Sequence, residues 1–183
     1  MSEYMFYDHP EHGAAEGRAY LNDIAFVLKP FIDGLLRTRK ENHFTCIAGS
    51  SMGGLISFYA GLYLPEVFGA VGVLSPALWL DAPRIFNETQ SLLLTDSRRN
   101  DPGLRQRWYF YAGALETETL ISEVATMVMI MRQSPHIEVT YQLDSGGIHD
   151  EIVWNHYFPN LYKWFTGLKP AEVVEGESHI RIP

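Results

Sequence analysis

Four short apolar runs alternate with segments of helical periodicity along this chain. The runs occupy residues 44–48, 68–74, 107–111 and 137–143. Short apolar runs bounded by turn residues are typical of buried strands, and strands that alternate with helices are typical of a parallel sheet. The sequence therefore predicts an α/β fold with a largely parallel sheet of about four core strands.

Helices are predicted where apolar residues recur at intervals of three and four. The first spans about 17–36, and Pro30 is expected to kink it or divide it in two. The apolar face of this helix is formed by Leu21, Ile24, Leu28, Phe31, Ile32 and Leu35.

Each strand is followed by a further helix. These are expected from about residue 54 to 63, over 85–94, from Thr117 or Thr119 to about 132, and from about 150 to 165 with an interruption at Pro159. The methionines at 127, 129 and 131 are expected to fill the core. The tail, 170–183, is expected to be loosely held. The length of 183 residues suits one domain with its own core, so the sequence predicts one domain over 1–183.

The turn between the first strand and its helix carries most of the chemical information. Gly49-Ser50-Ser51-Met52-Gly53 has the pattern G-x-S-x-G. Between a strand and a helix, this pattern is typical of a nucleophile elbow, a strained turn that lifts the serine hydroxyl off the sheet. Flanking glycines allow the turn, and the helix N-terminus favours negative charge. Ser51 is therefore the predicted nucleophile. The alternative is a glycine-rich turn that contains an ordinary serine.

Composition and charge narrow the classes of function. The net charge is −8 and the only basic run is 37–40, which argues against nucleic acid and anionic membranes as partners. The single cysteine, Cys46, excludes a disulfide framework and is expected to be a buried structural thiol. No apolar run is long enough to span a membrane, and the N-terminus lacks a signal-peptide pattern. The sequence predicts a soluble protein, and a cytoplasmic location unless a segment before this chain carries an export signal.

A serine hydroxyl becomes a good nucleophile when a histidine takes its proton and an acid orients that histidine. In α/β-hydrolases these partners follow the serine in the order acid, then histidine, on loops at the carboxyl ends of later strands. Of the seven histidines, only His149 lies just past the carboxyl end of a strand on a glycine-rich loop. His149 is therefore the predicted base.

The acid is predicted at the end of the third strand. Glu116 is the first choice and Glu118 the second, and Asp144 is the third because it belongs to the histidine's own strand. His9 and His12 have a spacing found in metal sites, but no third ligand lies nearby. No metal site is predicted.

Together these residues resemble the esterase family of α/β-hydrolases that includes enterochelin esterases, S-formylglutathione hydrolase, and feruloyl and acetyl-xylan esterases. The resemblance runs from about residue 3 to 166. It is carried by the segments 19–33, 49–57, 65–69 and 74–79, by Gly113-x-x-Glu116, and by His149 with the aromatic helix after it. It implies Ser51, Glu116 and His149 as the catalytic residues, with no metal or organic cofactor.

The chain departs from that family at its start. Members carry several strands before the helix that leads to the elbow, whereas residues 1–43 contain no convincing strand. The expectation is an N-terminally truncated fold that lacks the loop supplying the family's second oxyanion donor. The backbone N–H of Met52 is expected to supply one donor. The elbow strand should be an exposed edge, which invites a homodimer.

The resemblance also implies an aromatic acyl or alcohol pocket. Residues 3–12 should pass near Ser51 and bring Tyr4 and Phe6, while Trp79 approaches from the other side. The alternative for these aromatics is ordinary packing of surface loops.

The sequence thus predicts a serine-dependent carboxylic ester hydrolase that acts through an acyl-enzyme on a small-molecule ester with a small or aromatic acyl group. Acyl transfer to an acceptor other than water is left open. The alternative from another class is a catalytically impaired or inactive fragment that acts as a subunit or binding module.

Overall fold

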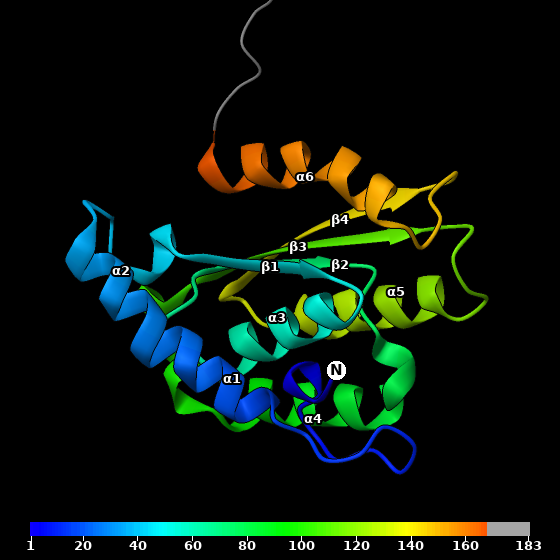
Figure 1. Ribbon diagram of the computed structural model, residues 1–183, viewed down its shortest axis with the longest axis horizontal. Helices are drawn as coiled ribbons and strands as arrows, with labels where there is room; N and C mark the ends of the chain where they lie inside the picture. Colours follow the sequence, from blue (N-terminus) through cyan, green and yellow to red (C-terminus); the bar gives the residue numbers. More distant parts are fainter. Residues whose placement is uncertain (168–183) are drawn as a thin grey trace, which may run out of the picture.

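One parallel sheet organises the molecule (Figure 1). The computed structural model describes residues 1–167. The strands lie in the order β1-β2-β3-β4, so β1 and β4 form the edges. Their bounds are β1 Cys46–Ser50, β2 Ala70–Leu74, β3 Gln106–Gly113 and β4 Ile137–Asp144. The four predicted strands, their parallel pairing and the edge position of the elbow strand are confirmed.

Helices cover both faces of this sheet. They are α1 Gly17–Asp23, α2 Lys29–Leu35, α3 Met52–Tyr63, α4 Ala82–Thr95, α5 Leu120–Met131 and α6 Glu151–Thr166. In Figure 1, α6 lies on one side of the sheet, and α3 and α5 lie on the other with α4 beyond them. The predicted α/β fold is confirmed. The tail 170–183 lies outside the described residues.

The core is largest between the sheet and α3. Nine of the twelve residues of α3 are buried, from Gly54 to Leu62, as expected for a helix that is apolar all round. All five residues of β2 are buried as well, because helices cover both of its faces. A smaller cluster under α6 contains Trp154 and Leu161.

Gly61 in α3 marks the closest approach of this helix to the sheet. A Cβ there would overlap a methyl group of Val71 and lie 2.7 Å from the ring of Trp108. We expect Gly61→Ala to lower the free energy of unfolding by about 1–3 kcal/mol, since overpacking forces neighbours to move. Urea denaturation measures the change. Gly34→Ala in α2 is the matched control, because a Cβ at Gly34 meets nothing within 4 Å; it should be neutral or stabilising.

The helix predicted over 17–36 is continuous, but it changes type near Pro30. A π-helical segment, η2 Ile24–Leu28, joins α1 to α2, and the N–H of Lys29 bonds to the carbonyl of Ile24 five residues back. The widened turn precedes the position where Pro30 cannot donate a hydrogen bond. The expected division near Pro30 is therefore a π-helical turn between α1 and α2, without a break in the helix.

The apolar face of that helix is only half buried. Leu21 is 2% exposed, but Leu28, Phe31 and Leu35 are 53–67% exposed. Because the sheet of the described residues ends at β1, none of these residues covers the second half of the helix.

Two smaller expectations also need correction. Pro159 does not interrupt α6, which runs through it, because Pro159 lies on the exposed face of the helix where a lost hydrogen bond is tolerated. Met129 is 62% exposed while Met127 and Met131 are fully buried, since residues two apart lie on opposite sides of a helix.

Among residues 1–167, no helix is both long and apolar enough to cross a bilayer.

Candidate active site

Ser51 occupies a strained turn between β1 and α3. Its φ is +53°, a left-handed conformation that is uncommon for residues other than glycine. Gly49 permits the turn, because a Cβ there would overlap the carbonyl of Gly53. Gly53 itself has open space around the Cβ position, so only the first glycine of the pattern is sterically required. The structure therefore has the strand, turn and helix of a nucleophile elbow.

His149 lies in the loop between β4 and α6 and reaches the serine. Its Nε2 is 2.9 Å from the Ser51 Oγ. The loop is held close to the end of β3, since the carbonyl of Gly147 accepts a hydrogen bond from Leu115, and a Cβ at Gly147 would overlap the hydroxyl of Tyr111. The side chain of His149 is 39% exposed, so the imidazole remains open to a substrate.

Glu116 holds the other nitrogen of this imidazole. Its Oε2 lies 2.7 Å from Nδ1 of His149, and its side chain is fully buried. Glu118, the second choice for the acid, is exposed. Asp144, the third, accepts hydrogen bonds from the Tyr111 hydroxyl and the N–H of Gly146, and the latter lowers the pKa of its carboxyl. The structure brings Glu116 to His149 and not the other two.

The second oxygen of Glu116 is fixed by two donors. The hydroxyl of Ser75 donates to Oε1 at 2.6 Å, and the N–H of Gly113 donates to it at 2.7 Å. Ser75 is fully buried, has φ +45°, and accepts a hydrogen bond from the indole N–H of Trp154 at 2.9 Å. Trp154 also packs edge-on against the ring of His149, with centroids 4.7 Å apart. These contacts fix both the carboxylate and the imidazole.

A cavity of about 820 Å³ opens beside Ser51. It follows β1 and lies between α1 with η2 on one side and the start of α6 on the other. Tyr4, from the short helix η1 Ser2–Tyr4, lines it as predicted, together with Ser51, Met52 and His149. Met52 is the first residue of α3, so its N–H has no partner within the helix and is available beside the serine.

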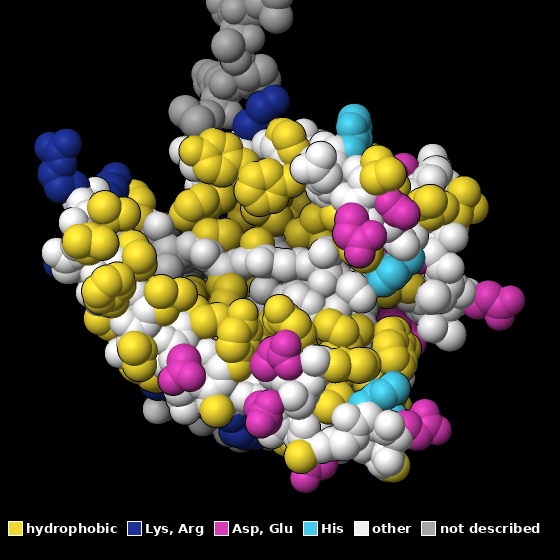
Figure 2. Space-filling view, viewed as in Figure 1, with side chains coloured by type: hydrophobic (Ala, Val, Ile, Leu, Met, Phe, Trp, Pro, Cys, Tyr) yellow, Lys and Arg dark blue, Asp and Glu magenta, His cyan; other side chains and the backbone are white. Residues whose placement is uncertain are grey.

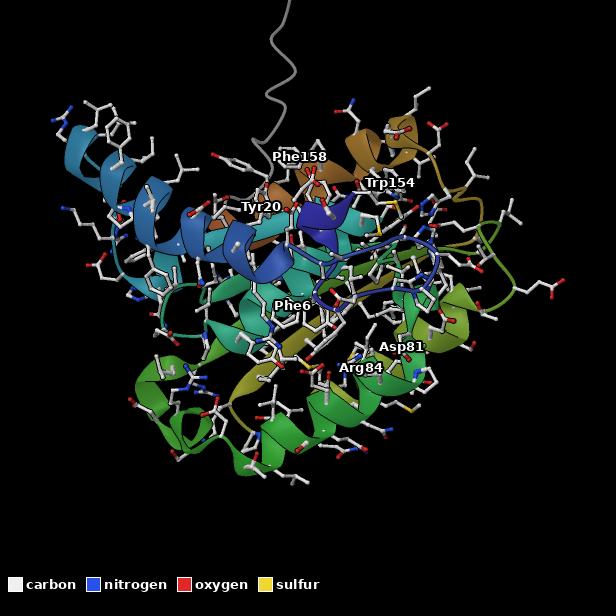
Figure 3. The ribbon with its side chains drawn as sticks, turned by 60° about the horizontal axis from the view of Figure 1, so that its bottom comes forward. Phe6, Tyr20, Asp81, Arg84, Trp154 and Phe158 are labelled. Carbon is white, nitrogen blue, oxygen red and sulfur yellow. The ribbon has the colours of Figure 1, made fainter. Side chains whose placement is uncertain are left out.

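Two of the predicted pocket aromatics lie elsewhere. Phe6 is 6% exposed and stacks on Tyr59 with ring centroids 4.1 Å apart, in the core beneath α3. Figure 3 shows Phe6 on the side of Asp81 and Arg84, away from Tyr20 and Trp154. Trp79, in η4 Leu78–Leu80, is 53% exposed and packs against His12. Neither lines the cavity, which corrects the expected acyl pocket at both positions.

Sequence reasoning missed Tyr20, Ser75 and Trp154. Ser75 carried a usable signal, because it directly follows the carboxyl end of β2, the edge where functional residues of parallel sheets gather. Trp154 lies one helical turn after the start of α6, within reach of the loop that holds His149. Tyr20, which lines the cavity, had no such pattern, since it lies beside the apolar stripe of α1.

Two other candidates stay outside this site. Cys46 is the first residue of β1, and burial raises the pKa of its thiol to about 12, which keeps it neutral and unreactive. The rings of His9 and His12 stack on each other. Among the described residues, no group of three potential metal ligands occurs.

Comparisons with known proteins place this geometry in a family. The model of the family described as "Putative esterase" matches residues 3–165. The iron(III) salmochelin esterase of Escherichia coli O6:H1 is 31% identical over 86% of this chain and 38% of its own length. This chain therefore spans less than half the length of that relative.

Solved structures share the fold. The BES protein from Bacillus cereus has a TM-score of 0.74 at 14% identity, covering 90% of this chain and 62% of that chain. An IroE-like serine hydrolase from Shewanella oneidensis has a TM-score of 0.72 at 15% identity, covering 91% of this chain and 57% of that chain. With a nucleophile elbow on a parallel sheet and a family model that matches most of its length, this chain belongs to the esterase family of α/β-hydrolases.

Proposed function

We propose that this chain is a serine-dependent carboxylic ester hydrolase that acts through an acyl-enzyme on small-molecule esters. The observation that carries the proposal is the continuous set of contacts from Ser51 Oγ to His149 Nε2 and from His149 Nδ1 to Glu116 Oε2, at 2.9 and 2.7 Å. These are the contacts that activate a serine as a nucleophile. The esterase relatives support the same reaction class.

The first half of the reaction forms the acyl-enzyme. With Nδ1–H donated to Glu116, the lone pair of His149 Nε2 faces the Ser51 hydroxyl and takes its proton as Oγ attacks the ester carbonyl. The buried carboxylate of Glu116 stabilises the imidazolium that results. The carbonyl oxygen becomes negative, and the N–H of Met52 donates to it. His149 then gives the proton to the leaving alcohol as the ester C–O bond breaks.

The second half regenerates the serine. Water replaces the alcohol, His149 takes a proton from it, and the hydroxide attacks the acyl carbon. The bond to Ser51 Oγ breaks, the proton returns to Oγ, and the carboxylic acid leaves. No metal or organic cofactor takes part in this scheme. The same acyl-enzyme also supports transfer to another alcohol, which competition between water and added methanol would measure.

A second candidate is an impaired fragment that serves as a subunit or binding module. It is favoured by one observation: beside Ser51, the N–H of Met52 is the single oxyanion donor that we identify in residues 1–167. Loss of one donor from such a site typically lowers kcat by about 10²–10³. A weak but serine-dependent activity is therefore compatible with the first proposal, and complete absence of acylation favours the second.

Labelling by a serine-directed fluorophosphonate separates these two candidates. We expect a single adduct on the purified chain, located at Ser51 by mass spectrometry of its peptides. Heat-unfolded protein is the control and should not react, because the serine is reactive only beside His149. A folded chain that forms no adduct would contradict the esterase proposal.

Ser75 is proposed as a positioning residue for Glu116. We expect Ser75→Gly, which suits the positive φ, to lower kcat for p-nitrophenyl acetate about tenfold and to change KM little, because the carboxylate loses a donor but the cavity is unchanged. The midpoint of the pH profile of kcat/KM should also move. Trp154→Phe removes the indole donor to Ser75 and also reduces the ring that packs against His149, so it should change kcat in the same direction through both contacts. A drop in thermal stability with an unchanged pH profile would indicate a purely structural role.

A further inference from the structure

The loop that carries His149 is short and rich in glycine. It begins at Asp144, the last residue of β4, and passes through Gly146 and Gly147 before it reaches the histidine. Glycine loses more backbone freedom on folding than any other residue, so a loop of this composition keeps one conformation only where other contacts fix it. In this structure those contacts converge on Asp144.

The backbone carbonyl of Asp144 joins two loops. It accepts hydrogen bonds from the N–H of Ala114 at 2.8 Å and from the N–H of Gly147 at 3.2 Å. The carbonyl of Gly147 in turn accepts from the N–H of Leu115 at 2.9 Å. Ala114 and Leu115 directly precede Glu116. The loop of the proposed acid and the loop of the proposed base are therefore tied to each other at the end of β4.

The side chain of Asp144 fixes the same turn. Its Oδ1 accepts a hydrogen bond from the N–H of Gly146 at 3.0 Å, and its Oδ2 accepts from the hydroxyl of Tyr111 at 3.1 Å. Tyr111 is fully buried in β3, so its hydroxyl is a fixed point. The N–H of Gly146 and, after it, the hydroxyls of Tyr157 and Tyr111 lower the pKa of the Asp144 carboxyl. The group is thus a carboxylate at neutral pH, which accepts strong hydrogen bonds.

Neutral donors stabilise the charge of this carboxylate. Figure 2 shows acidic side chains and no lysine or arginine on the right-hand side of the visible face, where the strands of Figure 1 end. In such surroundings a carboxylate depends on the N–H and O–H groups that donate to it. The ring of Tyr157, in α6, packs against that of Tyr111 with centroids 4.5 Å apart. Removal of the carboxylate would take away the acceptor of a covered hydroxyl, which is costly.

Gly147 lies directly against this pair. A Cβ at Gly147 would overlap the hydroxyl of Tyr111 and lie 2.9 Å from Oδ2 of Asp144. A Cβ at Gly113 would lie 2.5 Å from the carbonyl oxygen of Gly147 and 2.7 Å from Oε1 of Glu116. The two loops are therefore in close contact above the Tyr111–Asp144 pair. A shift of the turn would be passed on to the proposed acid and base.

We propose that Asp144 is a positioning residue, which holds the loop of His149 in register with the loop of Glu116. This inference rests on the proposed esterase function. The carboxylate of Asp144 contacts the turn and Tyr111 rather than the imidazole, so it acts through the backbone. This role differs from that of the acid, for which Asp144 was the third choice. A misplacement of about 1 Å can lower a rate by about 10², so a small shift of the loop is enough to matter.

Kinetics of two variants test this role. Asp144→Ala removes the carboxylate and keeps the backbone carbonyl. We expect it to lower kcat for p-nitrophenyl acetate by about 10–100-fold and to change KM by less than about threefold, because the cavity beside Ser51 is unchanged. Asp144→Asn keeps an acceptor for the N–H of Gly146 and an amide that can donate to the oxygen of Tyr111, so it should restore kcat to within about threefold of the wild type. An unchanged kcat in Asp144→Ala would overturn the proposal.

A double-mutant cycle separates positioning from a general loss of stability. Tyr111→Phe alone should lower kcat by about tenfold, and it should lower kcat little further when added to Asp144→Ala, because both changes remove the same contact. Tyr141→Phe is the matched control. The hydroxyl of Tyr141 is buried and has no hydrogen-bond partner among the described residues, so its loss should leave kcat within about twofold. Losses that multiply in the double variant would overturn the proposal.

The position of His149 can also be observed without catalysis. The tautomer of an imidazole is set by the hydrogen bond that its other nitrogen makes, and nitrogen chemical shifts of the labelled ring report it. We expect the Nδ1–H tautomer, directed at Glu116, in the wild type and in Asp144→Asn, and a mixture of tautomers in folded Asp144→Ala.

The two proposals fail in different ways. A ring that keeps the Nδ1–H tautomer in Asp144→Ala, or that lacks it in the wild type, would overturn the positioning role even if esters are hydrolysed. A wild type that shows the expected tautomer and loses it in Asp144→Ala, but hydrolyses no ester, would contradict the esterase proposal alone.

Discussion

Ser51→Ala should reduce kcat/KM for p-nitrophenyl acetate by at least about 10⁴, to the rate of the uncatalysed reaction in the same buffer. The expected loss is large because removal of the nucleophile leaves His149 with no hydroxyl to activate, and members of such a triad act as a unit. Steady-state release of p-nitrophenolate at several enzyme concentrations gives the measurement. Alanine retains the backbone conformation as well as serine does, since both have a Cβ at φ +53°.

The control for this variant is the neighbouring hydroxyl. Ser50→Ala removes an oxygen from the same cavity but no contact with His149, so it should change kcat/KM by only a few-fold. If Ser51→Ala and the wild type hydrolyse the ester at equal rates while both are folded, the proposed nucleophile is wrong and the inactive-fragment alternative stands.

Glu116→Gln should lower kcat by about 10³–10⁴ while the fold is retained. The glutamine oxygen can still accept from Ser75 and Gly113, so its amide nitrogen would face His149. That nitrogen donates a hydrogen bond, which forces Nδ1 of His149 to accept and places the ring proton on Nε2, toward Ser51. In this tautomer the imidazole cannot take the serine proton.

The matched control is Glu118→Gln, which removes the same charge from an exposed position two residues away. It should leave kcat within about twofold of the wild type, because exposed charges are strongly screened. A comparable loss in both variants would indicate that the effect is one of general electrostatics and would contradict the specific role proposed for Glu116.

The sequence was most informative where one local rule dominated. The strand-turn-helix context of Ser51 and the glycine-rich loop of His149 are local patterns, so both residues were predicted and the structure places them in contact. The sequence ranked Glu116 before Glu118 and Asp144, and the structure brings Glu116 to His149. Which carboxylate reaches the histidine depends on the path of the loop after β3. The N–H of Gly113 and the hydroxyl of Ser75 both donate to Glu116 and hold its carboxylate in place.

Positions that depend on the path of a loop were predicted less well. The aromatic segment near the N-terminus was expected to place both Tyr4 and Phe6 near the serine, but Tyr4 ends the short helix η1 and Phe6 lies beyond it, so the two side chains point in different directions. Tyr4 therefore lines the cavity while Phe6 packs beneath α3. The sequence likewise could not show that half of the apolar face of α1 and α2 is exposed. Periodicity identifies an apolar face but not whether another element covers it.

The origin of the site residues has a consequence for when the serine becomes reactive. Ser51, Ser75, Glu116 and His149 follow β1, β2, β3 and β4 in turn, and the contact between Ser51 and His149 joins positions 98 residues apart. Under the proposed mechanism, Ser51 emerges during synthesis long before its base, so its hydroxyl should stay inert until β4 has joined the sheet. If the proposed mechanism holds, a phosphonate probe applied during refolding should label Ser51 only after β4 has joined the sheet.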